Sequence, residues 1–265
     1  MLNREYLNVA LATIERDEVG PCLRGPYSAL WCASIFARGD GGPPSRDVRP
    51  ALQRAYGDLW AALTVMMRVE WQRQARRDGH LDEMRWMYFV AADLRELHVA
   101  LRAFYDALLL LVRPLLEKPG QVPLTSFRKL LQWLDDPQNW RRFDAEIGRE
   151  LLAARWFWDL RSVRDGLVHH GFQTLVFPDL DQVGFQVHDL DFNSLTHDGA
   201  MTSENVVGFE RYSAIQVGQA IGLFQRLCAI ALARFSKSDT PANLRAHHPG
   251  FGLLQSWAGP LAAEP

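Results

Sequence analysis

Apolar residues recur along most of the chain at the spacing of an amphipathic helix. The pattern is strongest over residues 94–112, where apolar positions alternate steps of four and three until Pro114 ends the run. Similar stripes predict further helices over about residues 47–77, 125–134, 140–168 and 217–235. We therefore expect a protein built mainly of helices.

The period changes from helical to alternating just before the last predicted helix. Residues 172–177 and 183–187 are rich in β-branched and aromatic side chains, and Pro-Asp-Leu-Asp lies between them. Two such runs around a short turn segment are typical of a β-hairpin. The sequence predicts an all-α helical bundle with a small β-hairpin, at about residues 172–188, inserted before the last long helix.

Glycine and proline divide the chain into three parts. We expect an N-terminal helix and a Gly/Pro-rich connector over residues 1–46, which includes the segment Gly-Asp-Gly-Gly-Pro-Pro. The bundle with its hairpin should occupy residues 47–236. Residues 237–265 carry several prolines and are expected to form a C-terminal tail.

Composition and charge exclude several classes of protein. The chain has 265 residues, of which 48% are hydrophobic, and a formal net charge of -2, so it is neither disordered nor a simple polycationic nucleic-acid binder. Its three cysteines are widely spaced and form no CxxC pair, which argues against a thiolate zinc site. The longest apolar run, residues 107–112, is too short to span a bilayer, and no signal peptide is recognisable. We expect a cytoplasmic protein with no membrane partner.

No familiar cofactor motif is present. The sequence lacks a Walker A loop, an HExxH pair and a GxSxG elbow. One loop is rich in His and Asp, but none of its residues has the i, i+4 helical spacing of a preformed metal site. We expect neither a cofactor nor a metal there, and interpret these residues as a solvated loop: His188, Asp189, Asp191, His197 and Asp198.

Two helical features have structural interpretations. His98 lies inside an apolar stripe and is predicted to be a core histidine with a hydrogen-bond partner. Gly218 and Gly222 lie one turn apart in the last long helix, which favours close approach of a neighbouring segment. Because Gln216 and Gln219 lie in the same segment, the glycine pair does not indicate a membrane helix dimer.

The chemistry of the chain concentrates at the end of the predicted helix over 140–168. Arg161, Asp165 and His169 are spaced i, i+4, i+8 and share one helical face, next to Arg164. Asp165 is expected to hold one imidazole nitrogen of His169 and so fix its tautomer. Histidine transfers protons near neutral pH, and arginine binds phosphate with a planar fork of donors. This combination favours chemistry on a phosphodiester.

Arg164, Asp165 and His169 resemble the R-x4–6-H signature of the HEPN superfamily of helical-bundle ribonucleases and their relatives. The residue after the arginine is commonly polar in that family, as it is here. Arg164 and His170 also fit the spacing. Arg73 and His80 fit it as well, but a glycine between them ends the predicted helix, so we regard this pair as a chance match.

The resemblance implies a metal-independent endoribonuclease that cleaves RNA by attack of the 2′-hydroxyl. Its catalytic residues would be Arg164, Asp165 and His169, with Arg161 and His170 as secondary candidates. Since one histidine cannot serve as base and acid together, the resemblance implies a homodimer with a composite site. It also suggests a toxin or phage-defence effector, with an antitoxin or another defence-system protein as partner.

Two other interpretations remain open at this point. The chain is alternatively a non-catalytic HEPN-like binding, nucleotide-sensing or regulatory subunit, or the motif only caps and salt-bridges the end of a helix.

Residues 141–164 carry six arginines against four acidic residues. That local excess of positive charge favours a modest RNA-binding groove.

Overall fold

The structure is a computed structural model that describes residues 45–171, 173–178, 183–192, 200–203, 205–235 and 250–263, together with residues 5, 6 and 8. Within these ranges the helices and strands follow one another in this order: α3 (Ser45–Arg77), α4 (Glu83–Val112), η1 (Arg113–Leu115), η2 (Pro119–Gln121), α5 (Phe127–Leu134), α6 (Pro137–Trp140), α7 (Ala145–Ala153), α8 (Trp156–Val168), β1 (Thr174–Pro178), β2 (Val183–Val187), β3 (Met201–Ser203), β4 (Val206–Gly208), α10 (Phe209–Phe235) and α11 (Gly250–Ala263).

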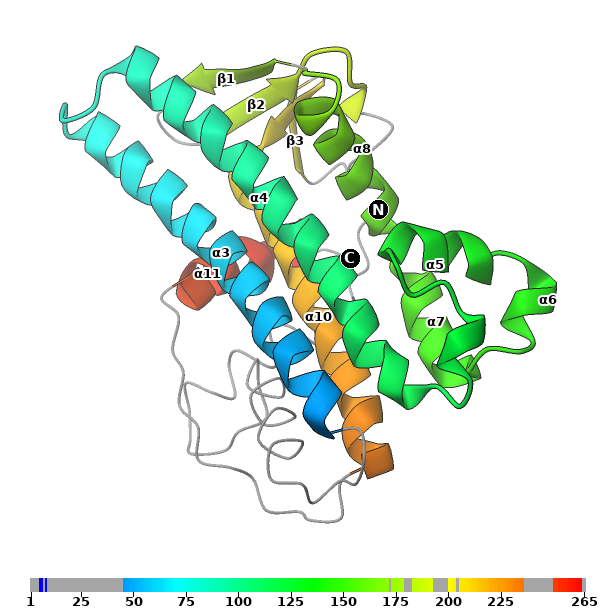
Figure 1. Ribbon diagram of the computed structural model, residues 1–265. Coiled ribbons are helices and arrows are strands. Elements are labelled where there is room, and N and C mark those ends of the chain that lie inside the picture. Colours follow the sequence, from blue (N-terminus) through cyan, green and yellow to red (C-terminus); the bar gives the residue numbers. More distant parts are fainter. Residues whose placement is uncertain are drawn as a thin grey trace, which may run out of the picture.

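Three long helices, α3, α4 and α10, pack along one another and form the centre of the fold (Figure 1). Their apolar stripes bury a continuous core, which confirms the predicted helical bundle. Within α10, the stretch Phe209–Ala231 is apolar and long enough to cross a membrane, but 89% of its most apolar window is buried in the fold. This burial fits the core helix of a soluble protein.

The helix predicted over residues 140–168 is divided in the structure. Asp144 caps a new helix, α7, by accepting hydrogen bonds from the N–H groups of Glu146 and Ile147. That helix ends at Ala153, because the backbone of Ala154 is not helical, and α8 then begins at Trp156. The prediction of one continuous helix was wrong. Apolar residues keep their helical spacing across the break between α7 and α8, so the pattern does not show the change in backbone direction.

The predicted hairpin is confirmed as β1 and β2, which pair antiparallel with Thr174 opposite Val187. Two further strands extend it to a sheet in the order β1-β2-β4-β3. β3 and β4 were not predicted, since three residues each are too few to show an alternating pattern. The sheet packs against α4, α8 and α10 at one end of the bundle (Figure 1).

The two ends of the chain contribute packing elements. Within the predicted C-terminal tail, α11 packs on α3 and α10 and buries Leu254, Ala258 and Leu261. Near the N-terminus, Glu5, Tyr6 and Asn8 are helical, as expected. The predicted connector at residues 39–44 lies outside the described residues.

His98 is a core histidine, as predicted. Its ring is fully buried, with Nδ1 2.7 Å from the Leu94 carbonyl and Nε2 2.7 Å from the Tyr212 hydroxyl. Since a carbonyl only accepts, Nδ1 carries the proton and Nε2 accepts from Tyr212. Burial lowers the pKa of His98 to about 4, so the ring is neutral at physiological pH.

Gly222 provides the close approach predicted for α10. A Cβ atom at this position would lie 2.2 Å from the backbone oxygen of Tyr6, so only glycine leaves room for the N-terminal segment. Tyr6 is buried there, donates a 2.5 Å hydrogen bond to the Glu150 carboxylate and packs edge-on against Trp156. The N-terminal segment thus rests directly on α10, α7 and α8.

We expect stability to fall in mild acid because of His98. Its pKa is about 4 in the folded state and about 6.5 unfolded, so the unfolded chain binds more protons between these values. The neutral ring is fully present above pH 6.5, and stability is lost as the pH falls towards 4. Urea unfolding should show a free energy of unfolding about 2 kcal/mol lower at pH 5 than at pH 7. His98→Gln should remove this part of the pH dependence, and an unchanged pH profile would contradict the assignment.

Replacing Gly222 by Ala should destabilise the protein. The helix gains up to about 1 kcal/mol of propensity, but the clash displaces Tyr6 and its buried contacts, for a net loss of about 1–2 kcal/mol in urea unfolding. Gly57→Ala in α3 is the matched control, since a Cβ there meets nothing within 4 Å. It should raise stability by about 0.5–1 kcal/mol. Equal effects from the two substitutions would show that Tyr6 does not rest on Gly222.

Candidate functional site

α8 is held by one apolar face and presents charged side chains on the other. Trp156, Leu160, Val163 and Leu167 follow the helical period and are buried. The Trp156 indole donates a 2.6 Å hydrogen bond to the Tyr105 hydroxyl of α4. The candidate site residues lie on the remaining face of α8, which therefore points away from the core.

The end of α8 is organised around Asp165. Its backbone carbonyl accepts hydrogen bonds from the N–H groups of His169 and His170, at 2.9 and 3.2 Å. Gly171 then adopts a φ of +66°, a left-handed conformation that glycine takes readily, and the chain turns towards β1. This turn leaves both histidine side chains exposed at the helix end.

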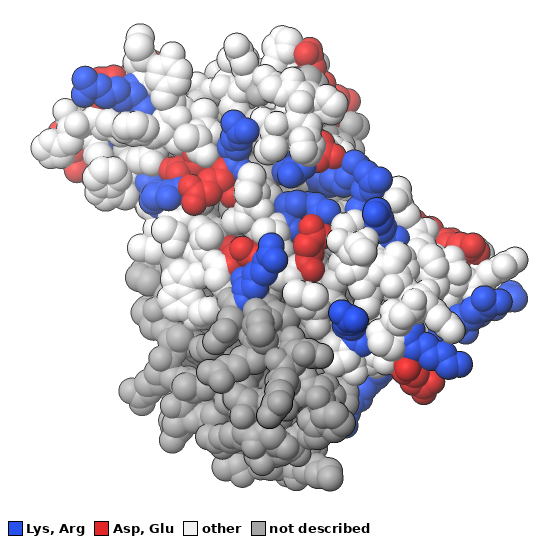
Figure 2. All heavy atoms as spheres, in the orientation of Figure 1, with Lys and Arg blue, Asp and Glu red and all other residues white. Residues whose placement is uncertain are grey.

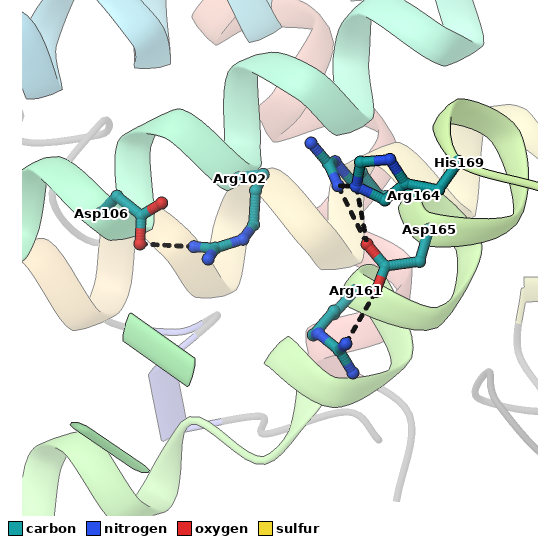
Figure 3. A network of polar contacts seen from close by, with 6 residues as sticks. All are labelled: Arg102, Asp106, Arg161, Arg164, Asp165 and His169. Carbon is teal, nitrogen blue, oxygen red and sulfur yellow. Dashed lines mark hydrogen bonds and ion pairs between the residues drawn. The ribbon is translucent and has the colours of Figure 1, made fainter. Parts of the chain in front are cut away.

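Four of the five predicted site residues form one polar cluster (Figure 3). The Asp165 carboxylate lies between two arginines, with Oδ2 2.8 Å from Arg161 Nη2 and Oδ1 3.0 Å from Arg164 Nη1. Arg164 Nη1 also contacts Nε2 of His169. The three charged side chains are partly buried, whereas His169 is 58% exposed and open to a ligand.

The predicted contact between Asp165 and His169 is corrected by the structure. Asp165 Oδ1 lies 4.0 Å from His169 Nε2, too far for a hydrogen bond. Because a guanidinium only donates, Arg164 makes Nε2 the acceptor and places the neutral ring's proton on Nδ1. Asp165 therefore holds the two arginines by short contacts, and its carboxylate lies only at ion-pair distance from His169, an interaction that needs a protonated ring. His170 is exposed, and its backbone N–H shares the Asp165 carbonyl.

Arg164 has an unused donor. Its Nε is buried, and no group in the described part of the chain accepts a hydrogen bond from it. A buried donor without a partner raises the free energy of this arrangement. Movement of the guanidinium onto an anionic ligand would relieve it, since both edges of the fork then find acceptors.

Sequence reasoning missed Arg102 and Asp106, which extend the site onto α4. Arg102 forms a 2.6 Å ion pair with Asp106 and lies over the Phe157 ring at 5.2 Å. Asp106 also accepts the backbone N–H of Phe127, which fixes the start of α5. Figure 3 shows the Arg102 guanidinium between Asp106 and the α8 cluster. The i, i+4 spacing of the pair was visible in the sequence, but its proximity to α8 was not.

The arginines of residues 141–164 do not all lie at the candidate site. Arg155 pairs with Asp135. Arg141 caps α6, which lies in Figure 1 at the far end of the small lobe formed by α5, α6 and α7. Figure 2 instead shows basic side chains gathered over the region of α4 and α8, with acidic side chains among them. The positive charge of the site therefore comes from two helices that are distant in sequence.

A separate cleft of about 630 Å³ lies in the small lobe, between the η1–η2 segment and α5–α7. Lys118, Trp133, Arg142 and Asp144 contribute to its walls, and none of the predicted site residues does.

Within the described ranges, no group of three or more His, Cys, Asp or Glu side chains is arranged to hold a metal ion. Comparison with known protein families, curated proteins and solved structures gave no match.

We expect the neutral His169 ring to carry its proton on Nδ1, because Nε2 accepts from Arg164. Two-bond ¹H–¹⁵N correlation spectra at about pH 8 should show this tautomer in the wild type. In Arg164→Ala the ring should move towards the Nε2–H form that free histidine favours, whereas Arg102→Ala should leave it unchanged. An Nε2–H ring in the wild type would show that the Arg164–His169 contact does not form in solution.

Proposed function

We propose that the protein is a metal-independent endoribonuclease whose reactive groups are His169 and Arg164. The observation that carries the proposal is the convergence of Arg164, Asp165 and His169 in one contact chain at an exposed helix end. The resemblance to the HEPN signature picks out the same three residues. An exposed imidazole beside an oriented guanidinium supplies a proton acceptor and a phosphate-binding group together.

The reaction needs only proton transfers and charge stabilisation. The ribose 2′-oxygen bonds to the adjacent phosphorus while the bond from phosphorus to the 5′-oxygen breaks. Nε2 of His169 takes the 2′-hydroxyl proton, and a second acid returns a proton to the leaving 5′-oxygen. The products are a 2′,3′-cyclic phosphate and a 5′-hydroxyl, and Arg164 remains charged throughout.

The same contact also controls access to the base. Arg164 occupies the acceptor nitrogen of His169, so the imidazole cannot accept a proton until the guanidinium moves. A phosphate offers Arg164 charged oxygens in place of the imidazole. A bidentate contact of the guanidinium with a phosphate is stronger than its contact with a neutral ring nitrogen. Binding of the substrate phosphate would thereby free Nε2 next to the scissile bond.

A homodimer completes the proposed site. One His169 cannot be both base and acid in a single turnover, so a second copy of the chain would contribute the other imidazole from its own α8. Arg161, and Arg102 across from it, would bind neighbouring phosphates of the RNA. A cytoplasmic toxin or phage-defence effector, held in check by an antitoxin or another defence-system protein, is the corresponding biological role.

The second candidate function is a non-catalytic HEPN-like binding, nucleotide-sensing or regulatory subunit. It is favoured by the mutual pairing of the cluster, because the one carboxylate of Asp165 already pairs with both Arg161 and Arg164 in the isolated chain. Such a protein would retain affinity for an anionic ligand, yet leave RNA intact.

We expect the purified full-length protein to cleave mixed RNA in excess EDTA. The products should end in 2′,3′-cyclic phosphate, as identified by mass spectrometry of the fragments. His169→Ala should lower the rate by at least about 100-fold, because a general acid–base group contributes a factor of this order. Arg164→Lys should also lower it, since lysine keeps the charge but not the planar fork.

His80→Ala is the matched control. His80 is also exposed and has the same spacing motif with Arg73, but Arg73 pairs with Glu70 and Glu210 instead. Its substitution should leave cleavage unchanged. The melting temperature of His169→Ala should stay close to that of the wild type, because a largely exposed side chain contributes at most about 0.5 kcal/mol. Cleavage that is equal in wild type and His169→Ala would rule out the proposed base, and RNA binding without any cleavage would favour the second candidate.

A further inference from the structure

β1 is an edge strand of the described sheet. Among the described strands it pairs with β2 on one side only. Leu175 and Phe177 are 44% and 38% exposed on its outer face, while Val176 between them is buried against the fold. Edge strands in soluble proteins are usually protected by charged residues, bulges or prolines. The five residues of β1 contain no charge and pair with β2 in unbroken register, and their one proline, Pro178, lies at the end of the strand.

The hydrogen-bond pattern shows which backbone groups face the open edge. The His188 N–H donates to the Gln173 carbonyl at 2.9 Å, in line with the β1–β2 register. Hydrogen-bonded and non-hydrogen-bonded pairs alternate along an antiparallel ladder. The backbone groups of Thr174, Val176 and Pro178 therefore point away from β2. Pro178 has no N–H, so its place on this strand leaves no unpaired donor there.

We propose that the open edge of β1 pairs antiparallel with β1 of a second copy of this chain, about a two-fold axis through Val176. In this register each Val176 N–H donates to the Val176 carbonyl of the second copy. Each Thr174 N–H donates to the second copy's Pro178 carbonyl. Every N–H that β1 directs outwards is then used, and the residue without an N–H serves only as an acceptor.

The side chains are self-complementary in the same register. Leu175 lies directly opposite Phe177 of the second copy, and both occupy a non-hydrogen-bonded pair, where opposing side chains are closest. The two-fold axis generates this pair twice, so four exposed apolar side chains pack side by side into one patch. No charged residue lies on either strand, so no like charges meet across the axis. A second copy thus fits the edge better than an arbitrary strand, which would have to match both features by chance.

The interface is small, which sets its strength. Two five-residue strands bury less than the roughly 1,600 Å² of a standard stable protein interface. We therefore expect weak, concentration-dependent association rather than an obligate dimer.

This surface differs from the one that the proposed ribonuclease needs. At about 3.4 Å per residue, antiparallel pairing about Val176 places the two Gln173 residues roughly 20 Å apart. The two α8 ends then lie at opposite ends of the paired strands and cannot share one composite site. The inference does not rest on RNA cleavage, and its readout is molecular mass, so either proposal can fail without the other.

Sedimentation equilibrium of the full chain, over about 2 to 300 µM, tests the proposal. We expect the average mass of the wild type to rise with concentration to at least about twice that of Leu175→Lys/Phe177→Lys, where lysines would meet across the axis; this difference reports pairing through β1 whether or not the chain also dimerises through α8. Leu110→Lys is the matched control, because Leu110 is 39% exposed on α4 and should not affect the doubling. RNA cleavage by the double variant should equal that of the wild type. Equal masses for the wild type and the double variant at every concentration would overturn the proposal.

A second measurement tests the register and does not depend on the lysine variant folding. In a Cys22→Ser/Cys32→Ser background, Leu175→Cys protein is mixed with Phe177→Cys protein under mild oxidation. The two introduced thiols lie opposite each other only in the proposed register, so the mixture should form disulfide-linked dimers faster than either protein alone. Equal rates in the mixture and in the separate proteins would contradict the register.

Discussion

The position of the candidate site depends on an aromatic cluster that joins α8 to α4 and α5. Phe157 packs against Tyr105 and Phe127 with ring centroids 5.3 and 4.9 Å apart, and the neighbouring Trp156 donates its hydrogen bond to Tyr105. Burial raises the pKa of Tyr105, so its hydroxyl stays neutral and remains an acceptor. These large buried surfaces leave α8 one way to lie on the bundle. Its charged face must then point outwards.

That orientation concentrates positive charge on an open surface. Arg161 and Arg164 come from α8 and Arg102 from α4, and two carboxylates, those of Asp165 and Asp106, hold them in place. Such a surface is stable without a ligand, because each arginine has an internal partner. A phosphate can take the place of the His169 imidazole on Arg164 without breaking the pairing with Asp165, since its charged oxygens are stronger acceptors than a neutral ring nitrogen. The arginines that pair with carboxylates in the ligand-free protein are thus the groups that we expect to bind a phosphate.

The sequence predicts the elements that have strong periodicity and the residues that share a helical face. The long helices, the β1–β2 hairpin and the core position of His98 follow from spacing alone. The contact of His169 with Arg164 rather than Asp165 does not, because both residues lie within reach of the imidazole and the side-chain rotamers, which spacing leaves open, decide between them. Arg102 was missed for another reason: its place beside α8 depends on how the bundle folds. Near the C-terminus, α11 was not predicted, because Pro249 precedes it and Pro260 lies within it. Its packing on the bundle stabilises the helix despite these prolines.

The central claim is that the end of α8 binds the RNA backbone through Arg164 and so exposes Nε2 of His169. Titration with an RNA oligonucleotide whose 2′-hydroxyls are all methylated, and which therefore cannot be cleaved, tests this most directly. The account predicts that the ring ¹⁵N signals of His169 and the side-chain signal of Arg164 shift together on addition of this RNA. If the RNA binds and shifts signals elsewhere, for example around the cleft with Lys118 and Arg142, while both α8 signals stay unchanged, the account is contradicted.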